Sequence, residues 1–245
     1  GRVARIDQTI KEKRHMTIIA YFIQTSVCMG IFYAFYCLFL KSETTFQINR
    51  IYLISTVFIS LIFPLIKIPV DFLDNSISDG VALVINSDSS QNKTAEIIQH
   101  QTFNWISVIL VIYYAGAMFY LYRFAREILS LRKIRKLGNQ VVLQGHNCIL
   151  SNNVQTPFSF FKNIYLPARQ QFDETELIRI IQHESVHISE KHSIDNIVLE
   201  LIKIVFWINP FIHFYQRRMK ELHEFIADAE VVSNEGRDGY CNFLI

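Results

Sequence analysis

Residues 17–40 read TIIAYFIQTSVCMGIFYAFYCLFL, a run rich in Ile, Phe, Tyr and Leu that contains no charged side chain. A helix rises about 1.5 Å per residue, so this run is long enough to cross a hydrocarbon core of about 30 Å. A cleavable signal peptide would have a shorter apolar core and a small-residue cleavage site, whereas this run ends in Phe39 and Leu40 before Lys41. We therefore predict a transmembrane helix that stays in the mature chain.

Two further apolar runs have the length of transmembrane helices. Residues 51–70 are interrupted by Lys67, whose long side chain can reach the membrane interface, and by Pro64, which is expected to kink the helix. Residues 105–122 begin and end with an aromatic residue, as a span does when aromatic side chains lie at both interfaces. The chain is thus predicted to have three spans.

The composition of the whole chain agrees with a membrane protein. Of its 245 residues, 51% are hydrophobic and only 19% are charged, and the mean hydropathy is +0.21. This apolar excess is more than an ordinary soluble domain needs, and it excludes a disordered or collagen-like chain. A formal net charge of +2 argues against direct nucleic-acid binding, and the four scattered cysteines form no disulfide framework.

The distribution of Lys and Arg predicts the orientation of the membrane domain, residues 16–122. Residues 123–139 form a basic linker helix that is expected on the cytoplasmic side, because cytoplasmic segments carry an excess of Lys and Arg. Three spans then place the N-terminus and the loop 71–104 on the outer face. The basic tail 1–15 opposes this orientation, so we expect Met16 to be the natural start and the tail to be non-native.

Residues 140–235 are predicted to form an α+β domain. Short β-prone pieces predict a small sheet, and Asp173 and Glu176 form a capping box that opens a helix. A later helix from Asp195 is expected to end at Asn209, with Pro210 opening the next one. The β-prone pieces are residues 141–144, 148–151 and 163–166.

The helix after Asp173 carries the motif His183-Glu-Ser-Val-His187. On a helix, histidines four residues apart have their imidazoles on one face, one turn apart, where they can bind one Zn²⁺. Glu184 would then lie beside the metal as the general base of a hydrolase. The alternative interpretation is a pair of core histidines that are satisfied by hydrogen bonds.

A catalytic zinc needs a third protein ligand, and the segment Glu221-Leu-His-Glu-Phe-Ile-Ala-Asp228 offers candidates. Glu224 is favoured because Asp228 follows one turn later, from where it could accept a hydrogen bond from a ligand histidine and fix its tautomer. Glu221 and His223 stay open as alternative ligands. The same residues would also suit an ordinary solvated helix face.

These motifs resemble those of the BlaR/MecR type of integral-membrane zinc metallopeptidase, family fifty-six among the metallopeptidases, in its Bacteroidetes-like form. The resemblance covers nearly the whole chain from Met16. It implies a mainly α membrane protein in which three transmembrane helices are followed by a gluzincin-like zinc peptidase domain on the cytoplasmic side of the bacterial inner membrane. The segments that carry it are Thr45–Arg50, Pro157–Phe161, His183–His187, Trp207–Phe211 and Glu224–Asp228.

The resemblance also implies roles for single residues. It makes His183, His187 and Glu224 the ligands of one zinc ion per chain and Glu184 the catalytic base. The substrate would be a protein strand added to a sheet edge near residues 160–166. A second donor for the oxyanion is wanted, and His192, His213 and His223 are the candidates.

In the resembled family an outer signal activates the peptidase, which cleaves itself or a transcriptional repressor, and a homodimer is compatible with this. Residues 236–245 have no terminator character, so we expect a truncated end that lacks a fourth span and any outer sensor domain. Two other functions stay open. One is a housekeeping membrane protease resembling the CAAX prenyl protease and HtpX families, and the other is a non-enzymatic membrane scaffold with a fortuitous motif.

Overall fold

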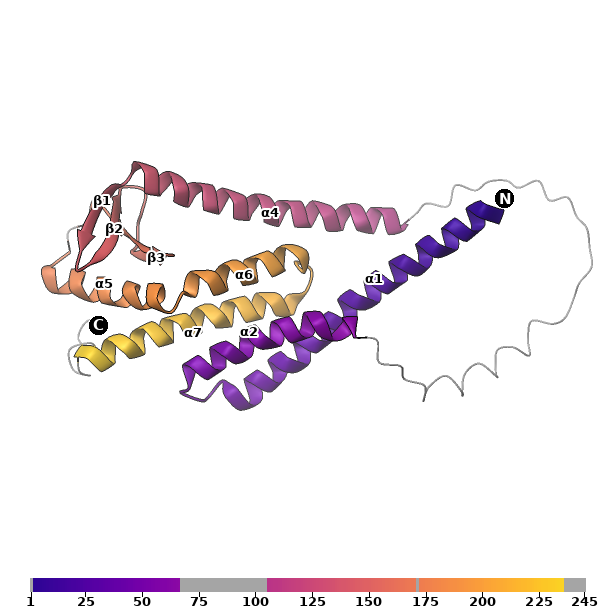
Figure 1. Ribbon diagram of the computed structural model, residues 1–245, viewed down its shortest axis with the longest axis horizontal. Coiled ribbons are helices and arrows are strands. Elements are labelled where there is room, and N and C mark those ends of the chain that lie inside the picture. The colour runs from indigo at the N-terminus through magenta and orange to yellow at the C-terminus, as the bar shows by residue number, and fades with distance from the viewer. Residues whose placement is uncertain (1, 67–104, 171, 236–245) are drawn as a thin grey trace, which may run out of the picture.

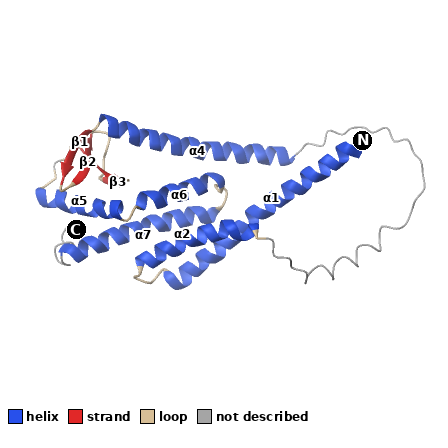
Figure 2. Cartoon of the chain, viewed as in Figure 1, coloured by secondary structure: helices blue, strands red, loops and turns tan. Residues whose placement is uncertain are grey.

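A computed structural model describes residues 2–66, 105–170 and 172–235 of the chain (Figure 1). Within these residues the protein is mainly helical, with one small sheet at the end of a long helix (Figure 2). The predicted outer loop at 71–104, Lys67 and the chain end at 236–245 lie outside the described residues.

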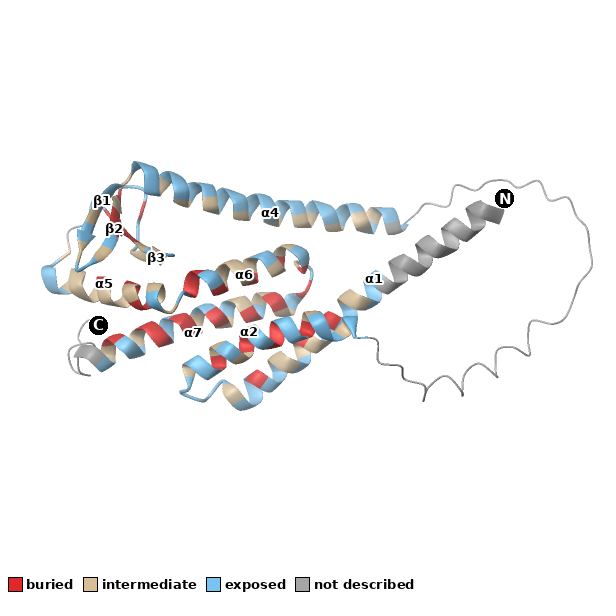
Figure 3. Cartoon of the chain, viewed as in Figure 1, coloured by how far each residue is buried: buried red, intermediate tan, exposed pale blue. Residues whose placement is uncertain are grey.

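Three of the described helices are long and apolar enough to cross a membrane. Helix α1 (Arg2–Phe35) continues into the π-helical turn η1 (Tyr36–Leu40), and α2 (Phe46–Ile62) continues into the 3₁₀ turn η2 (Phe63–Leu65). Helix α4 (Trp105–Leu137) is unbroken. Much of their surface is exposed (Figure 3), and no residue in the most apolar window of α4 is buried. Such apolar surfaces suit contact with lipid.

The second and third helices differ from the sequence prediction at their ends. Helix α2 begins at Phe46, so Arg50 belongs to the helix and not to the connection that precedes it. Pro64 lies in η2 and ends the helix, where a kink within a longer span was expected, because proline removes a backbone donor and clashes with the preceding turn. The third span and the basic linker form one continuous helix.

The sheet has the strand order β1-β2-β4-β3. Strands β1 (Asn139–Leu143) and β2 (His146–Ser151) are antiparallel, β2 and β4 (Asn163–Pro167) are parallel, and β3 (Phe158–Phe160) is antiparallel to β4. Three strands match predicted pieces, and β3 was missed. The edge predicted near residues 160–166 is also corrected, because β4 pairs on both sides and β3 is the edge strand beside it.

Helices α5 (Glu174–Ser189), α6 (His192–Val205) and α7 (Pro210–Glu235) complete the fold. Pro210 opens α7 as predicted, whereas α6 both begins and ends earlier than expected. Asp173 is the N-cap of α5, but its carboxylate accepts a hydrogen bond from the Thr175 hydroxyl at 2.7 Å and makes no capping bond. The predicted capping box is therefore wrong.

The last two helices pack directly on the apolar helices α1 and α2. Their common core contains Tyr36 and Leu53 from the first two helices and Leu199, Tyr215 and Met219 from α6 and α7. Figure 1 shows α2, α6 and α7 side by side. One apolar core therefore joins the predicted membrane domain to the segment that carries the candidate metal ligands.

The turn between α6 and α7 also lies against the membrane-length helices. The Phe206 ring lies 4.9 Å from the ring of Phe22 in α1, and the Trp207 indole donates to the carbonyl of Tyr113 in α4 at 3.2 Å. Gly116 of α4 makes room for this indole, since a Cβ there would lie 2.2 Å from it. These contacts hold the α6–α7 hairpin alongside the spans, with α5 at its far end.

Candidate metal centre

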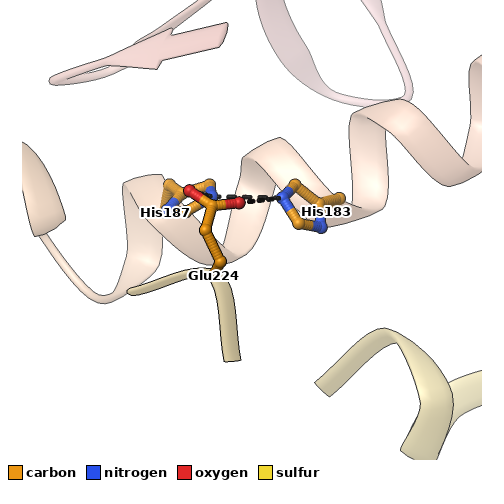
Figure 4. Close-up of side chains that lie close together, drawn as sticks. All are labelled: His183, His187 and Glu224. Atoms are coloured by element: carbon orange, nitrogen blue, oxygen red, sulfur yellow. Dashed lines mark hydrogen bonds and ion pairs between the residues drawn. The ribbon is translucent and has the colours of Figure 1, made fainter. Parts of the chain in front are cut away.

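Helix α5 carries the two histidines of the motif one turn apart, with 3.2 Å between His183 Nε2 and His187 Nε2 (Figure 4). Other faces of the helix are fixed by packing. Ile181 is buried against the sheet, and Val186 packs on Ile226 and Ala227 of α7. This packing sets the rotation of α5 about its axis, so the motif lies where α7 passes.

Glu224 of α7 reaches both histidines. Its carboxylate oxygens lie 3.5 Å from His183 Nε2 and 3.9 Å from His187 Nε2 (Figure 4). One ligand atom from each of the three residues lies within 4.8 Å of the others, so together they could hold a metal ion. The Glu224 side chain is 60% exposed, which leaves the cluster open on one side.

The two alternative third ligands have other partners. Glu221 accepts a hydrogen bond from Arg218 at 2.6 Å and pairs with Arg217. His223 is buried, and its Nε2 lies 3.1 Å from a carboxylate oxygen of Asp195. Of the three candidates from α7, the structure places Glu224 at the histidine pair. His213, one of the candidate oxyanion donors, lies 3.0 Å from the carbonyl of Trp207.

The outer nitrogen of each motif histidine has a partner. His183 Nδ1 lies 3.2 Å from a carboxylate oxygen of Asp228, and His187 Nδ1 lies 2.7 Å from Nδ1 of His192. Metal-bound histidines almost always use their outer nitrogen in this way, which fixes the tautomer and the ring orientation. The donor set of two imidazoles and one carboxylate, with both rings held from behind, therefore fits Zn²⁺.

The sequence predicted Asp228 as a partner of a ligand histidine, but it did not predict that His192 contacts the outer nitrogen of His187. Asp228 could be found because it follows Glu224 by one helical turn. His192 begins the next helix, beyond a sharp corner at which Lys191 has a left-handed backbone with φ 58°. No regular spacing relates His192 to the motif, so it stood only as a candidate oxyanion donor.

Glu184 lies between the two histidines in sequence and is 8% exposed. Burial raises the pKa of its carboxyl, and hydrogen bonds from the Ser159 side chain and backbone partly oppose this. Ser159 is the central residue of the edge strand β3. A carboxylate with a raised pKa, close to both the candidate metal ligands and a sheet edge, suits proton transfer near neutral pH.

The two motif histidines titrate in opposite directions in the metal-free chain. Burial lowers the pKa of His183, but hydrogen bonds to Asp228 and Glu224 outweigh this and raise the pKa to about 10. Burial lowers the pKa of His187 to about 4, and nearby His183 and His223 also lower it. At neutral pH His187 is thus neutral, as a metal ligand must be, whereas His183 would have to lose a proton before it could bind a metal.

Three membrane-length helices and a histidine-carboxylate cluster define a membrane protein with a candidate metal centre. Comparison with known families specifies the class further. The chain belongs to the family described as BlaR1 peptidase M56, whose model matches residues 51–245. The resemblance seen in the sequence is confirmed at the level of the family.

One curated relative is the regulatory protein BlaR1 of Staphylococcus aureus. It is 23% identical over an alignment of 155 residues that covers 58% of this chain and 26% of the relative. The chain thus matches about a quarter of the length of this relative.

Proposed function

We propose that this protein is a membrane-embedded zinc metalloendopeptidase of the BlaR/MecR signal-transducer type. The proposal rests on the cluster in which the ligand atoms of His183, His187 and Glu224 lie within 4.8 Å of one another. Glu184 lies beside this cluster and is hydrogen-bonded to Ser159 at the edge of the sheet. His183, His187 and Glu224 would hold one Zn²⁺ per chain, and Asp228 would orient His183. A bound Zn²⁺ would supply Lewis-acid activation of a water molecule and of the scissile carbonyl.

The chain's own residues would position the substrate and move the proton. Strand β3 pairs with β4 on one side, and among the described strands no other pairs with it. An extended substrate could therefore add to β3 through main-chain hydrogen bonds, which give affinity with little sequence specificity. Glu184, adjacent to β3 through Ser159, would accept a proton from the attacking water and pass it to the leaving amine.

The arrangement of the helices supports an orientation for the site. Helix α5, which carries the motif, lies at the end of the bundle at which α1 and α2 are connected, and Phe46 at the start of α2 packs against the apolar cluster that contains Val186 of the motif (Figure 1). Helix α4 has basic residues in its last turn, which lies at the same end. The positive-inside rule places that end in the cytoplasm of a bacterium. The substrate would then be a cytoplasmic protein such as a transcriptional repressor, or the chain itself, cleaved in response to an outer signal.

Metal content tests the proposal. We expect about one zinc per detergent-purified chain, measured by elemental analysis, and a loss of this zinc in Glu224→Ala. Glu221→Ala is the matched control, because Glu221 lies on the same helix and pairs with arginines instead. Equal zinc in the two variants would contradict the ligand assignment. Well-folded wild-type protein without zinc under metal-replete conditions would instead favour the scaffold interpretation.

A further inference from the structure

Arg50 in α2 binds the corner between α5 and α6. Its guanidinium donates to the Glu190 carboxylate at 2.9 Å, to the Glu190 carbonyl at 2.7 Å and to the Asp195 carboxylate at 2.6 Å. Glu190 is the C-cap of α5, where the last carbonyls of a helix lack partners and a cation is favourable. One residue of a membrane-length helix therefore holds both the end of the motif helix and the start of the next helix.

A chain of side chains leads inward from this corner to the candidate metal site. The Asp195 oxygen that Arg50 contacts also lies 3.1 Å from His223 Nε2. The His223 ring stacks on His192, with 3.9 Å between centroids and 15° between planes. His192 Nδ1 in turn lies 2.7 Å from the outer nitrogen of His187.

The chain is buried, and each member depends on the next for its position. His192 and His223 are each 2% exposed. In the part of the chain that the structure describes, His192 Nε2 has no hydrogen-bond partner, so the ring is held by His187 and by the stack on His223. His223 is held by Asp195, and Asp195 by Arg50. Buried polar chains of this kind move as a unit, because breaking one bond leaves a buried group unpaired.

We propose that α2 positions the metal ligand His187 through this chain, with Arg50 as the positioning residue at its membrane end. The inference rests on the proposed metal centre and adds a route by which a membrane helix reaches it. A displacement of α2 relative to the α5–α6 corner would turn His187 and so change the hold on the metal. Since α2 precedes residues 71–104 in the sequence, which are predicted to form the outer loop, an outer signal could act along this helix.

Arg218 provides a matched control for Arg50. Both side chains are 13% exposed, and both join a membrane-length helix to the C-terminal helices. Arg218 donates to the Tyr36 hydroxyl at 2.7 Å and to Glu221 at 2.6 Å. Neither partner belongs to the chain behind His187. Replacing Arg218 therefore removes a comparable tie between helices and leaves that chain intact.

The test compares Arg50→Gln, Arg218→Gln, His192→Phe and the double variant Arg50→Gln/His192→Phe in the full chain. Zn²⁺ affinity and the visible spectrum of the Co²⁺-loaded protein are measured, with thermal unfolding as the check on folding. His192→Phe keeps a ring on His223 but removes the acceptor for His187, so its affinity should fall about 10- to 100-fold. Arg50→Gln should weaken affinity about 2- to 30-fold and alter the Co²⁺ spectrum, whereas Arg218→Gln should change neither.

The double variant decides whether Arg50 acts through His192. If it does, the two losses of affinity are not additive, because His192→Phe has already broken the chain. Arg50→Lys serves if Arg50→Gln does not fold, and it should have an intermediate affinity. Equal effects of Arg50→Gln and Arg218→Gln, or fully additive losses, would overturn the inference while leaving the metal centre in place. Absence of metal binding by the wild-type chain would overturn the proposed function and this inference with it.

Discussion

The Nδ1 atoms of the two motif histidines have different partners. His183 faces the carboxylate of Asp228 on α7, four residues after Glu224 on the same helix. His187 faces the neutral ring of His192, which belongs to a chain that ends at Arg50 in α2. One candidate ligand thus contacts the helix that carries the third candidate ligand, and the other contacts a chain of side chains that leads to a helix of membrane length.

Because of this difference, the two histidines are expected to make metal affinity depend on two different things, pH and the position of α2. The carboxylate behind His183 raises the pKa of that imidazole to about 10, so a proton competes with the metal for Nε2. Burial lowers the pKa of His187 to about 4, and nearby His183 and His223 lower it further against the opposing effect of Glu224, so no proton would compete there at neutral pH. In the proposed metal centre, His183 would make the metal affinity depend on pH, and His187 would make it depend on the position of α2.

The largest effect is expected from Glu184→Gln, which should abolish most of the activity while leaving metal binding by both histidines intact. Glu184→Gln removes the proposed base but neither of the outer hydrogen bonds, so zinc content should stay near one per chain. Peptidase activity should fall about 10²- to 10⁴-fold, because a positioned general base contributes about that much. Cleavage of an unfolded protein substrate in detergent measures the activity. Loss of zinc in this variant would show that Glu184 holds the metal and that the assignment of roles is wrong.

A smaller effect is expected from Asp228→Asn, which changes the surroundings of His183 alone. Removing this partner of a ligand should weaken Zn²⁺ binding about 10- to 100-fold. The pKa of His183 should also fall toward its ordinary value, since the Asp228 hydrogen bond is the largest contribution that raises it. Calorimetry in two buffers of different ionisation enthalpy measures the protons released on binding at pH 8.

For the wild-type chain the expected release is close to one proton, from His183. Asp228→Asn should release fewer protons at the same pH. His192→Phe should weaken binding without this change in proton release, because His187 carries no proton at pH 8. Equal proton release from the wild type and Asp228→Asn would contradict the claim that Asp228 raises the pKa of His183.

The sequence could predict the parts of the site that depend on local spacing. The interval from His183 to His187 defines one face of a helix, and the interval from Glu224 to Asp228 does the same on α7. Arg50 and His192 could not be assigned in this way. The first lies in a helix far away in the sequence, and the second follows a corner at Lys191 that breaks the helical repeat.

The fold was predictable to a similar extent. Apolar length predicted three membrane-length helices. Helix α2 begins at Phe46, before the predicted run, and ends early because of Pro64, while α4 begins as predicted and continues into the basic segment. Strand β3 has three residues, too few to show a strand alternation. Periodicity shows that one face of α7 is buried, but it does not show that the partners of this face are α1 and α2.

The last expected effect is on the stability of the metal-free chain. Between pH 4 and 6.5 the unfolded chain has both histidines protonated, while the folded chain protonates only His183, so stability rises with pH. Between pH 6.5 and 10 the folded chain still holds the His183 proton and the unfolded chain does not, so stability falls. One proton of difference gives a slope of about 1.4 kcal/mol per pH unit, so these two histidines alone would give the stability a maximum near pH 6.5.

Thermal unfolding of chelator-treated protein from pH 5 to 9 measures this maximum. Asp228→Asn should flatten the fall above pH 6.5, because His183 then keeps its proton less strongly, and should leave the rise below pH 6.5 in place. His192, whose pKa burial lowers to about 2, also favours folding only while it is neutral, so it steepens that rise. A free energy of unfolding that increases steadily from pH 6.5 to 9 would show that the folded site holds no extra proton. The pKa of His183 would then not be raised, and the predicted difference between the two histidines would be wrong.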